Sequence, residues 1–278
     1  MTEAEAFVGQ RPRPPILSVS LVILIGVGLV ALFGPALAPH DPTDFLTDNP
    51  FSPPRKGMWL GTDNLGRDIL SRLIDGTRLT LIMALAATVL AHLIGGTLGL
   101  IAAVSGGILD ALVSRIADIV LSLPKIIVGL VVVAALGPSI AVIVILAGIV
   151  YAAGVFRIAR ALGTDLIRHD FVQVARSRGE GLGWILVGEI LPHVVRPLAA
   201  DFALRTSFAI LFMSSLSFLG LGVQPPMADW GGLVRENLQG LTAGSFAPIF
   251  PALAIAGTSI ALNLLVDNLS ESQDRKIG

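Results

Sequence analysis

The chain has 278 residues, of which 54% are hydrophobic and only 14% are charged, and its formal net charge is −1. Soluble domains usually carry about 25% charged residues, so this composition and a mean hydropathy of +0.81 indicate a membrane protein. The small net charge gives no reason to expect nucleic-acid binding. The absence of cysteine excludes disulfides, thiolate metal sites and cysteine nucleophiles.

Six apolar segments are long enough to cross a hydrocarbon core of about 30 Å. We expect these spans at residues 16–37, 79–104, 112–136, 139–156, 197–219 and 246–266, with Pro124 interrupting the third. Only helices and closed barrels satisfy every backbone polar group in lipid, and these runs are longer and more continuous than barrel strands. The sequence therefore predicts an all-α polytopic membrane protein with six transmembrane helices.

Arginine and lysine residues are more frequent in the segments that lie inside when the N-terminus is cytosolic. The positive-inside rule then predicts that both termini are cytosolic. We expect a cytosolic tail at 1–15, an uncleaved first span with an external loop at 16–78, a core domain at 79–268 and a second cytosolic tail at 269–278.

A polar segment between the fourth and fifth spans is predicted to form a short helix. Asp170 can act as its N-cap, with Gln173 completing a capping box, and Gly179 can end it in a left-handed conformation. One face of this helix would carry Phe171, Val174, Ala175 and Arg178. A helix of about eight residues is marginal alone in water. It either packs on the protein's own helix ends or enters a partner's groove, where Arg176 and Arg178 would meet acidic residues.

The same segment carries a family resemblance. Gln173-Val174-Ala175, Gly179 and Leu191-Pro192 resemble the Glu-Ala-Ala signature of membrane subunits of ATP-binding cassette importers, with Gln173, Val174 and Glu189 as departures. Segments 60–72, 76–78, 106–124 and 215–231 resemble the peptide/nickel/opine permease family, and its dipeptide-type "C" subunit in particular. The resemblance runs from about residue 59 to the C-terminus.

This resemblance implies a type I ABC importer permease fold in a bacterial inner membrane. It implies four kinds of partner: a second, unlike permease, two ATPases that bind ATP and Mg, an extracytoplasmic substrate-binding protein, and lipid. The chain has no G-x-x-x-x-G-K-[ST] phosphate loop. We therefore expect no cofactor in this chain and no enzyme activity of its own, with ATP hydrolysis on partner chains.

The resemblance also assigns site residues. It implies a cytosolic coupling helix at 160–183 within the core domain. The ATPase-coupling residues would be Asp170, Phe171, Gln173, Val174, Ala175, Arg176, Arg178, Gly179, Leu191 and Pro192. Phe171 would be the apolar side chain that enters the ATPase cleft, and Pro192 would fix the angle at which the fifth span starts.

The external loop holds four candidates for docking of the binding protein. They are Asp63, Arg67, Asp68 and Arg72. Asp68 can cap the helix that follows it, or one of the two acids can hold a cation. The two arginines can pair with those acids or with the binding protein, and the sequence leaves both alternatives open.

Candidates for the pathway or its outer gate lie in and after the fifth span. They are Asp201, Arg205, Ser215, Gly220, Gly222 and Trp230. Asp201 and Arg205 are spaced for an ion pair one helical turn apart, but polar residues deep in lipid are also functional suspects. Arg205 could instead line the pathway and contact a charged peptide terminus. We place Lys125 near the cytosolic surface.

The histidines have no metal-ligand spacing, and no Ser-His-Asp grouping supports an intramembrane hydrolase. The predicted function is a permease subunit of an ATP-driven importer for peptides or peptide-like solutes. The rival is a gradient-driven secondary transporter that works without ATPases. The sequence does not choose among dipeptides, longer peptides, opines and nickel chelates.

Overall fold

The computed structural model describes the backbone of residues 15–277 and the side chains of residues 19–268. The expected N-terminal tail at 1–15 lies outside these residues except for Pro15, where the first helix begins. The main helices are α1 (Pro15–Leu37), α2 (Ile69–Ala91), α3 (Thr97–Ser105), α4 (Gly107–Ser122), α5 (Lys125–Leu136), α6 (Ile140–Leu166), α7 (Asp170–Ser177), α8 (Leu182–Trp184), α9 (Leu191–Phe218), α10 (Trp230–Glu236) and α11 (Ile249–Ile277). Residues 269–277, expected as a tail, continue α11.

Two π-helical turns join helices that otherwise run on. His92–Gly96 connects α2 to α3, and Ile185–Ile190 connects α8 to α9. Each joined helix extends well beyond the apolar run that revealed it. The second span therefore begins at Ile69 rather than at residue 79, and the fifth begins at Leu182 rather than at 197.

Within the described chain, five helices are long and apolar enough to cross a membrane. A sixth span results if α4 and α5, which are bent by 89° at the break between them, cross together. The prediction of a proline interruption in the third span is confirmed, because Pro124 is the N-cap of α5. The all-helical prediction is also confirmed, since no strand is present among the described residues.

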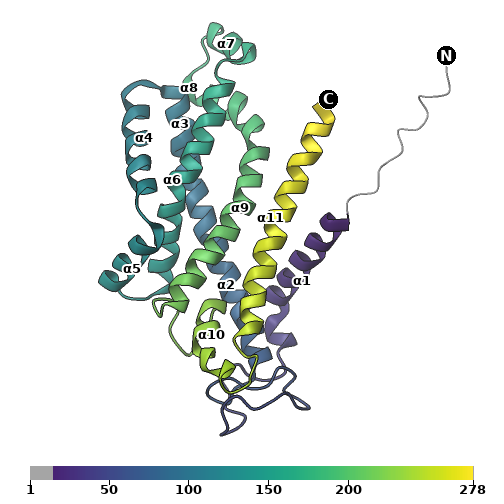
Figure 1. Ribbon diagram of the computed structural model, residues 1–278. Helices are drawn as coiled ribbons and strands as arrows, with labels where there is room; N and C mark the ends of the chain where they lie inside the picture. The colour runs from purple at the N-terminus through teal and green to yellow at the C-terminus, as the bar shows by residue number, and fades with distance from the viewer. Residues whose placement is uncertain (1–14, 278) are drawn as a thin grey trace, which may run out of the picture.

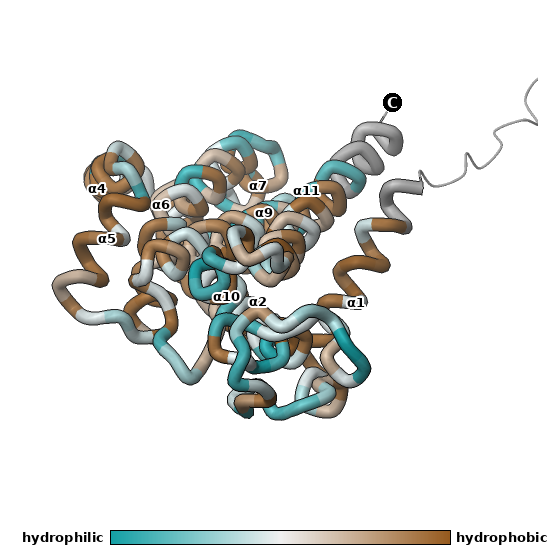
Figure 2. The backbone as a smooth tube through the Cα atoms, turned by 60° about the horizontal axis from the view of Figure 1, so that its bottom comes forward, coloured by the Kyte–Doolittle hydropathy of each residue, from teal (hydrophilic) through white to brown (hydrophobic). Residues whose placement is uncertain are grey.

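The spans form one elongated bundle, with α7 at one end and α10 at the other (Figure 1). α2, α6 and α9 make the core, α1 packs against α2 and α11, and the bent pair α4–α5 lies along α6. In Figure 2, hydrophobic residues (brown) predominate along α1, α4 and α5, whereas hydrophilic residues (teal) are frequent near α10 and in the loop before α2. The end of the molecule that carries α10 and the loop before α2 is called the α10 end. The opposite tip, which carries α7, is called the α7 end.

Close contact between helices depends on glycine. Gly95 and Gly99 are one turn apart and face α6, where an added Cβ would lie 2.2 Å from the Ala152 carbonyl oxygen and 2.6 Å from that of Phe156. Small residues at this spacing let transmembrane helices approach each other closely. This packing holds the frame on which both polar ends are built.

Candidate functional site

The short helix α7 stands at the tip of the molecule between α6 and α8 (Figure 1). The helix is confirmed, but its predicted capping box is wrong. The N-cap is His169, without a side-chain hydrogen bond, and Asp170 lies inside the first turn, where its charge still suits the helix dipole. The amide of Gln173 instead donates to the Ile167 carbonyl at 2.9 Å.

The end of α7 is as the sequence predicts. Gly179 has φ of +81°, a region in which a side chain is strained. The Gly179 N–H donates to the Arg176 carbonyl at 2.9 Å, and the Glu180 N–H donates to the Ala175 carbonyl at 3.2 Å. This pair of bonds is a Schellman motif, which satisfies carbonyl groups at the helix end.

The buried face of α7 differs from the predicted one. Val172 and Ala175 are fully buried, whereas Val174 is 54% exposed. The buried pair belongs to an apolar cluster with Leu100, Val104, Ala159, Ile185, Ile190 and Val194. α7 therefore packs firmly on the ends of α3, α6 and α9, and its opposite face remains open.

Phe171 does not project freely from α7. Its ring stacks on that of His193, with the two centroids 5.0 Å apart. The ring of the N-cap residue, His169, has its centroid 5.9 Å from that of Phe171. Val174 is instead the large apolar side chain that α7 exposes, beside the exposed Arg176 and Arg178. The Arg178 side chain, 57% exposed, lies 3.6 Å from the Glu189 carboxylate.

The sequence-predicted Leu191 and Pro192 lie in a continuous helix rather than at its entry. The π-helical turn Ile185–Ile190 comes immediately before them, and the helix runs on to Phe218. Pro192 is the second residue of α9 and follows this π-helical turn almost directly. It does not mark the start of the fifth span.

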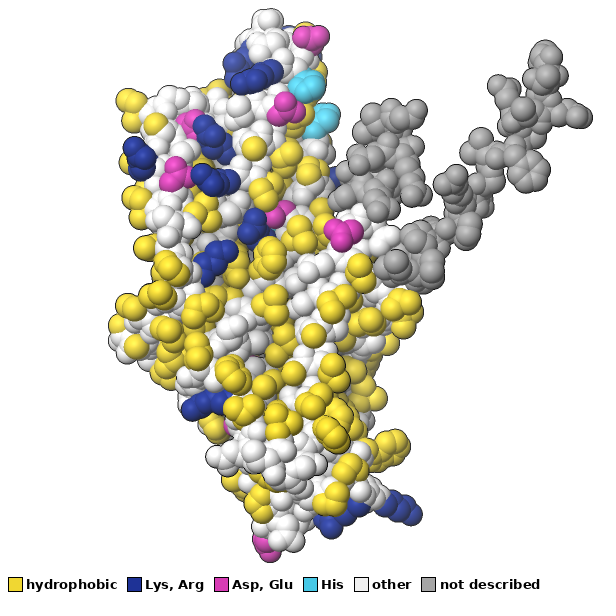
Figure 3. Space-filling model, viewed as in Figure 1, with side chains coloured by type: hydrophobic (Ala, Val, Ile, Leu, Met, Phe, Trp, Pro, Cys, Tyr) yellow, Lys and Arg dark blue, Asp and Glu magenta, His cyan; other side chains and the backbone are white. Residues whose placement is uncertain are grey.

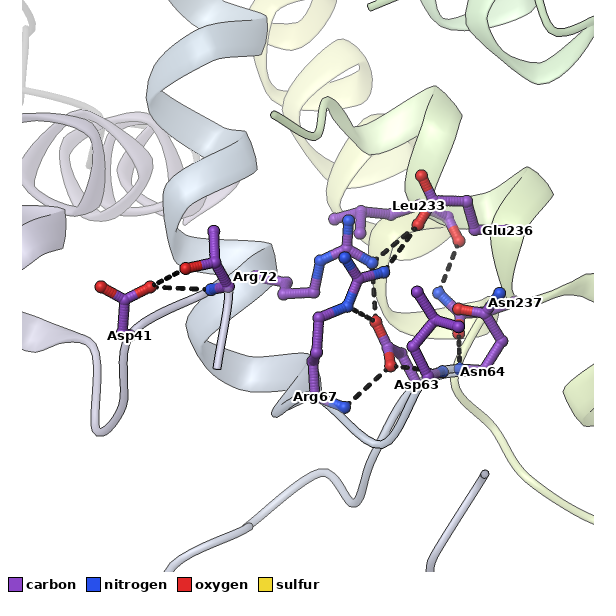
Figure 4. Close-up of polar contacts among 10 residues, drawn as sticks. Asp41, Asp63, Asn64, Arg67, Arg72, Leu233, Glu236 and Asn237 are labelled. Atoms are coloured by element: carbon purple, nitrogen blue, oxygen red, sulfur yellow. Dashed lines mark hydrogen bonds and ion pairs between the residues drawn. The ribbon is translucent and has the colours of Figure 1, made fainter. Parts of the chain in front are cut away.

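At the α10 end, charged side chains form a buried network (Figure 4). Asp63 accepts from Arg67 Nε at 2.8 Å and from Arg72 Nη1 at 2.7 Å. Arg72 Nη1 also donates to Glu236 on α10 at 2.7 Å. The Asp63 and Arg72 side chains are each 1% exposed, and that of Arg67 is 6% exposed.

This network settles the alternatives that the sequence left open. The two arginines pair within the chain, with Asp63 and with Glu236, which the sequence did not single out. Asp68 caps α2, accepting from the Ser71 N–H at 2.9 Å. All four of these side chains are buried within the described chain.

The expected gate residues also have structural roles. Trp230 is 1% exposed and donates from its indole to Thr77 at 3.2 Å, which fastens α10 to α2. A Cβ on Gly222 would lie 1.7 Å from Ser217 Oγ, so this turn requires glycine. Gly220 has φ of +88°, a conformation that favours glycine. The exposed Ser215 donates its hydroxyl to the Leu211 carbonyl of the same helix. Gly220 and Gly222 border a cavity of about 270 Å³ that opens between α9 and α10.

Burial at the α10 end affects the pKa of the Asp229 carboxyl group. Asp229 is the N-cap of α10 and accepts from the Gly232 N–H at 2.9 Å. The Ser217 hydroxyl donates to it at 2.5 Å. Burial nevertheless raises the pKa of Asp229 above its usual value.

Within the spans, the predicted ion pair between neighbouring turns of α9 is present. Arg205 Nε donates to Asp201 at 3.1 Å. His92, from the π-helical turn before α3, approaches the other Asp201 oxygen at 3.4 Å, a contact that the sequence did not reveal. Among the residues that the structure describes, no group of three potential metal ligands occurs.

Comparisons with known proteins identify this arrangement. Residues 95–278 match the family described as "Binding-protein-dependent transport system inner membrane component", and residues 15–54 match the "N-terminal TM domain of oligopeptide transport permease C". The chain belongs to the binding-protein-dependent transport permeases. Its spans therefore have the type I ABC permease fold, and the chain is a multi-pass transport subunit and not an enzyme.

Relatives match over nearly the whole chain. The "Glutathione transport system permease protein GsiD" of Pectobacterium atrosepticum is 35% identical over 89% of this chain and 83% of its own length. The "Dipeptide transport system permease protein DppC" of Alkalihalophilus pseudofirmus is 34% identical over 98% and 90%. The "Di/tripeptide transport system permease protein DppC" of Pseudomonas aeruginosa is 35% identical over 92% and 87%.

Proposed function

We propose that this permease forms half of the translocation pathway of an ATP-driven importer for peptides or peptide-like solutes. A second, unlike permease forms the other half, two ATPases bind ATP and Mg, and an extracytoplasmic binding protein delivers the solute. The names of the relatives, dipeptide, di/tripeptide and glutathione permeases, support this substrate class. The chain lies in the bacterial inner membrane, with both termini and α7 in the cytosol.

The observation that carries the proposal is the two-sided character of α7. Its buried side, Val172 and Ala175, is fixed in the apolar cluster at the helix ends. Its open side presents Val174, Gln173 and Arg176. A short helix that is anchored on one face and open on the other can transmit the motion of an ATPase to α6 and α9. A gradient-driven transporter would have no use for such a surface.

Reconstitution of the complete importer in liposomes tests this function. Uptake of a labelled dipeptide should require ATP and the binding protein, and an ion gradient alone should not support it. Uptake by this chain alone under a gradient would establish the rival.

Substitution on the open face of α7 tests the coupling role. Val174→Asp places a charge on the exposed apolar contact, and it should abolish uptake and reduce stimulation of the ATPase by the binding protein. Asn49→Asp adds the same charge to an exposed position at the α10 end and is the matched control. Normal uptake by the Val174→Asp importer would contradict coupling through α7.

A further inference from the structure

Polar and charged side chains of α5, α6 and α9 lie close to one another inside the candidate spans. Arg205 on α9 bonds Asp201, and Lys125 at the start of α5 places its ammonium 4.7 Å from the ring centre of Tyr151 on α6. The sequence places Lys125 near the cytosolic surface; in the structure it is the first residue of α5, directly after the break at Pro124, and it is partly exposed. The Tyr151 hydroxyl donates to the Phe208 carbonyl at 2.9 Å, which ties α6 to α9 at this level.

The cluster lies well inside the candidate membrane-spanning helices. Tyr151 follows the first residue of α6, Ile140, by 151 − 140 = 11 positions, which is about 17 Å along the helix. Arg205 precedes the last residue of α9, Phe218, by 218 − 205 = 13 positions, or about 20 Å. Both positions therefore lie more than two helical turns inside the candidate spans Ile140–Leu166 and Leu182–Phe218.

The charges of the cluster do not balance. The cluster holds two basic side chains, Arg205 and Lys125, and one carboxylate, that of Asp201, which pairs with Arg205 and approaches His92. His92 adds no negative charge in either protonation state. An uncompensated cation in the middle of a membrane is costly and marks functional sites. An anion from outside the described chain would remove this imbalance.

The free donors point to the form of that anion. Arg205 meets Asp201 through Nε, and among the described residues no acceptor lies within hydrogen-bond distance of its two Nη atoms. These atoms form the flat edge of the guanidinium that binds a carboxylate through two parallel hydrogen bonds. Within the described part of the chain, the Lys125 ammonium contacts the Tyr151 ring and has no hydrogen-bond acceptor.

Gly154 on α6 makes room for this edge. A Cβ at Gly154 would lie 2.8 Å from Arg205 Nη1 and 3.0 Å from its Cζ. Gly154 and Lys125 are partly exposed, so the free donors are not sealed within the protein. In Figure 3, Lys and Arg side chains reach the surface over α6 and α9 midway along the molecule, beside an acidic side chain and with apolar side chains nearby.

We propose that Arg205 and Lys125 form a carboxylate-binding site in the translocation pathway. The Nη edge of Arg205 would hold the carboxylate, with Lys125 as a second cation, and Asp201 and Tyr151 would position these two side chains. The ligand class is a solute that carries a free carboxylate, such as the C-terminus of a peptide. This inference rests on the proposed permease function.

Direct binding to the complete importer in nanodiscs, without the binding protein, tests the site. The probes are labelled N-acetyl-alanyl-alanine, which has one free carboxylate, and its C-terminal amide. By equilibrium dialysis, the free acid should bind at least about tenfold more tightly than the amide, because a charge-assisted bidentate contact is lost in the amide. Equal binding of both probes, or binding of neither, would overturn the proposal; the latter is expected if a carboxylate of the second permease fills the site.

Variants connect the preference to these residues. Arg205→Gln and Lys125→Gln should each reduce binding of the free acid toward that of the amide. Gly154→Ala is a second kind of variant, which changes the position of the guanidinium without removing any charge. It should weaken binding of the free acid several-fold. Arg157→Gln, which removes an exposed arginine that pairs with Asp118, is the control. An unchanged preference in the first three variants would sink the idea.

The proposed function is read separately in the same preparation, from stimulation of ATP hydrolysis by the binding protein. Stimulation without a carboxylate preference would reject the site and leave the permease function standing. A lack of stimulation in the wild-type importer would reject the function itself.

Discussion

The two polar ends of the molecule use the same residue types in opposite ways. At the α10 end, Asp63 and Arg72 are each 1% exposed, and their charges are satisfied by each other and by Glu236. At the α7 end, the Arg178 side chain is 57% exposed and its carboxylate contacts are 3.6 Å or longer. The first arrangement joins distant parts of one chain, and the second leaves donors for another chain.

Burial explains the difference. A charge in a dry site must be paired, and removal of one member leaves the other uncompensated. An exposed pair is hydrated and contributes little to stability. Charge at the α10 end therefore serves the fold, whereas we propose that charge at the α7 end serves contact with another chain. The same substitution made at both ends should separate these roles.

Arg72→Met should have the largest effect. It removes the arginine that joins Asp63 to Glu236 and leaves a buried carboxylate short of a donor. We expect a loss of about 3–5 kcal/mol in the free energy of unfolding. Thermal or denaturant unfolding of the purified subunit in detergent measures it, with the exposed Lys56→Met as control. If Arg72→Met lowers the free energy of unfolding no more than Lys56→Met does, the network is dispensable for stability.

How much of these ends the sequence predicts depends on the range of the contacts. Local features were predictable: the Asp68 cap, the left-handed Gly179 and the ion pair between Asp201 and Arg205. Each involves residues within four positions, where helix geometry fixes the distance.

Contacts between distant segments were not predictable. Glu236 lies 164 residues from Arg72, and His92 reaches Asp201 from a π-helical turn that hydropathy does not reveal. The face of α7 was also misjudged. In an eight-residue helix, periodicity alone does not distinguish a face with Val174 from one with Val172, and packing on α3 and α9 decides it.

Gly179→Leu should have an intermediate effect at the α7 end. A side chain at φ of +81° costs about 1–2 kcal/mol, and the chain can relieve this strain by unwinding the last turn of α7. We expect uptake to fall while the binding protein still delivers solute and ATP hydrolysis continues. Uptake and ATP hydrolysis by the reconstituted importer measure the uncoupling.

Gly181→Leu is the matched control for this change. Gly181 has φ of −72°, and nothing lies within 4 Å of a Cβ built on it. The same side chain two positions later should therefore be accepted without strain. If both variants transport normally and keep normal ATP hydrolysis, the left-handed stop of α7 has no part in coupling.

Arg178→Met should have the smallest effect on stability. It removes an arginine from exposed contacts with Glu180 and Glu189, so the free energy of unfolding should change by less than about 1 kcal/mol. Any larger consequence should appear in assembly with the ATPases, because in the wild-type protein the exposed Arg178 is available to an acidic partner. It is measured as the salt dependence of ATPase binding to the permease. A loss as large as that of Arg72→Met would mean that the α7 end is also held together by its charges. Equal stability with weaker, less salt-sensitive ATPase binding would instead separate the two ends as a structural network and a contact surface.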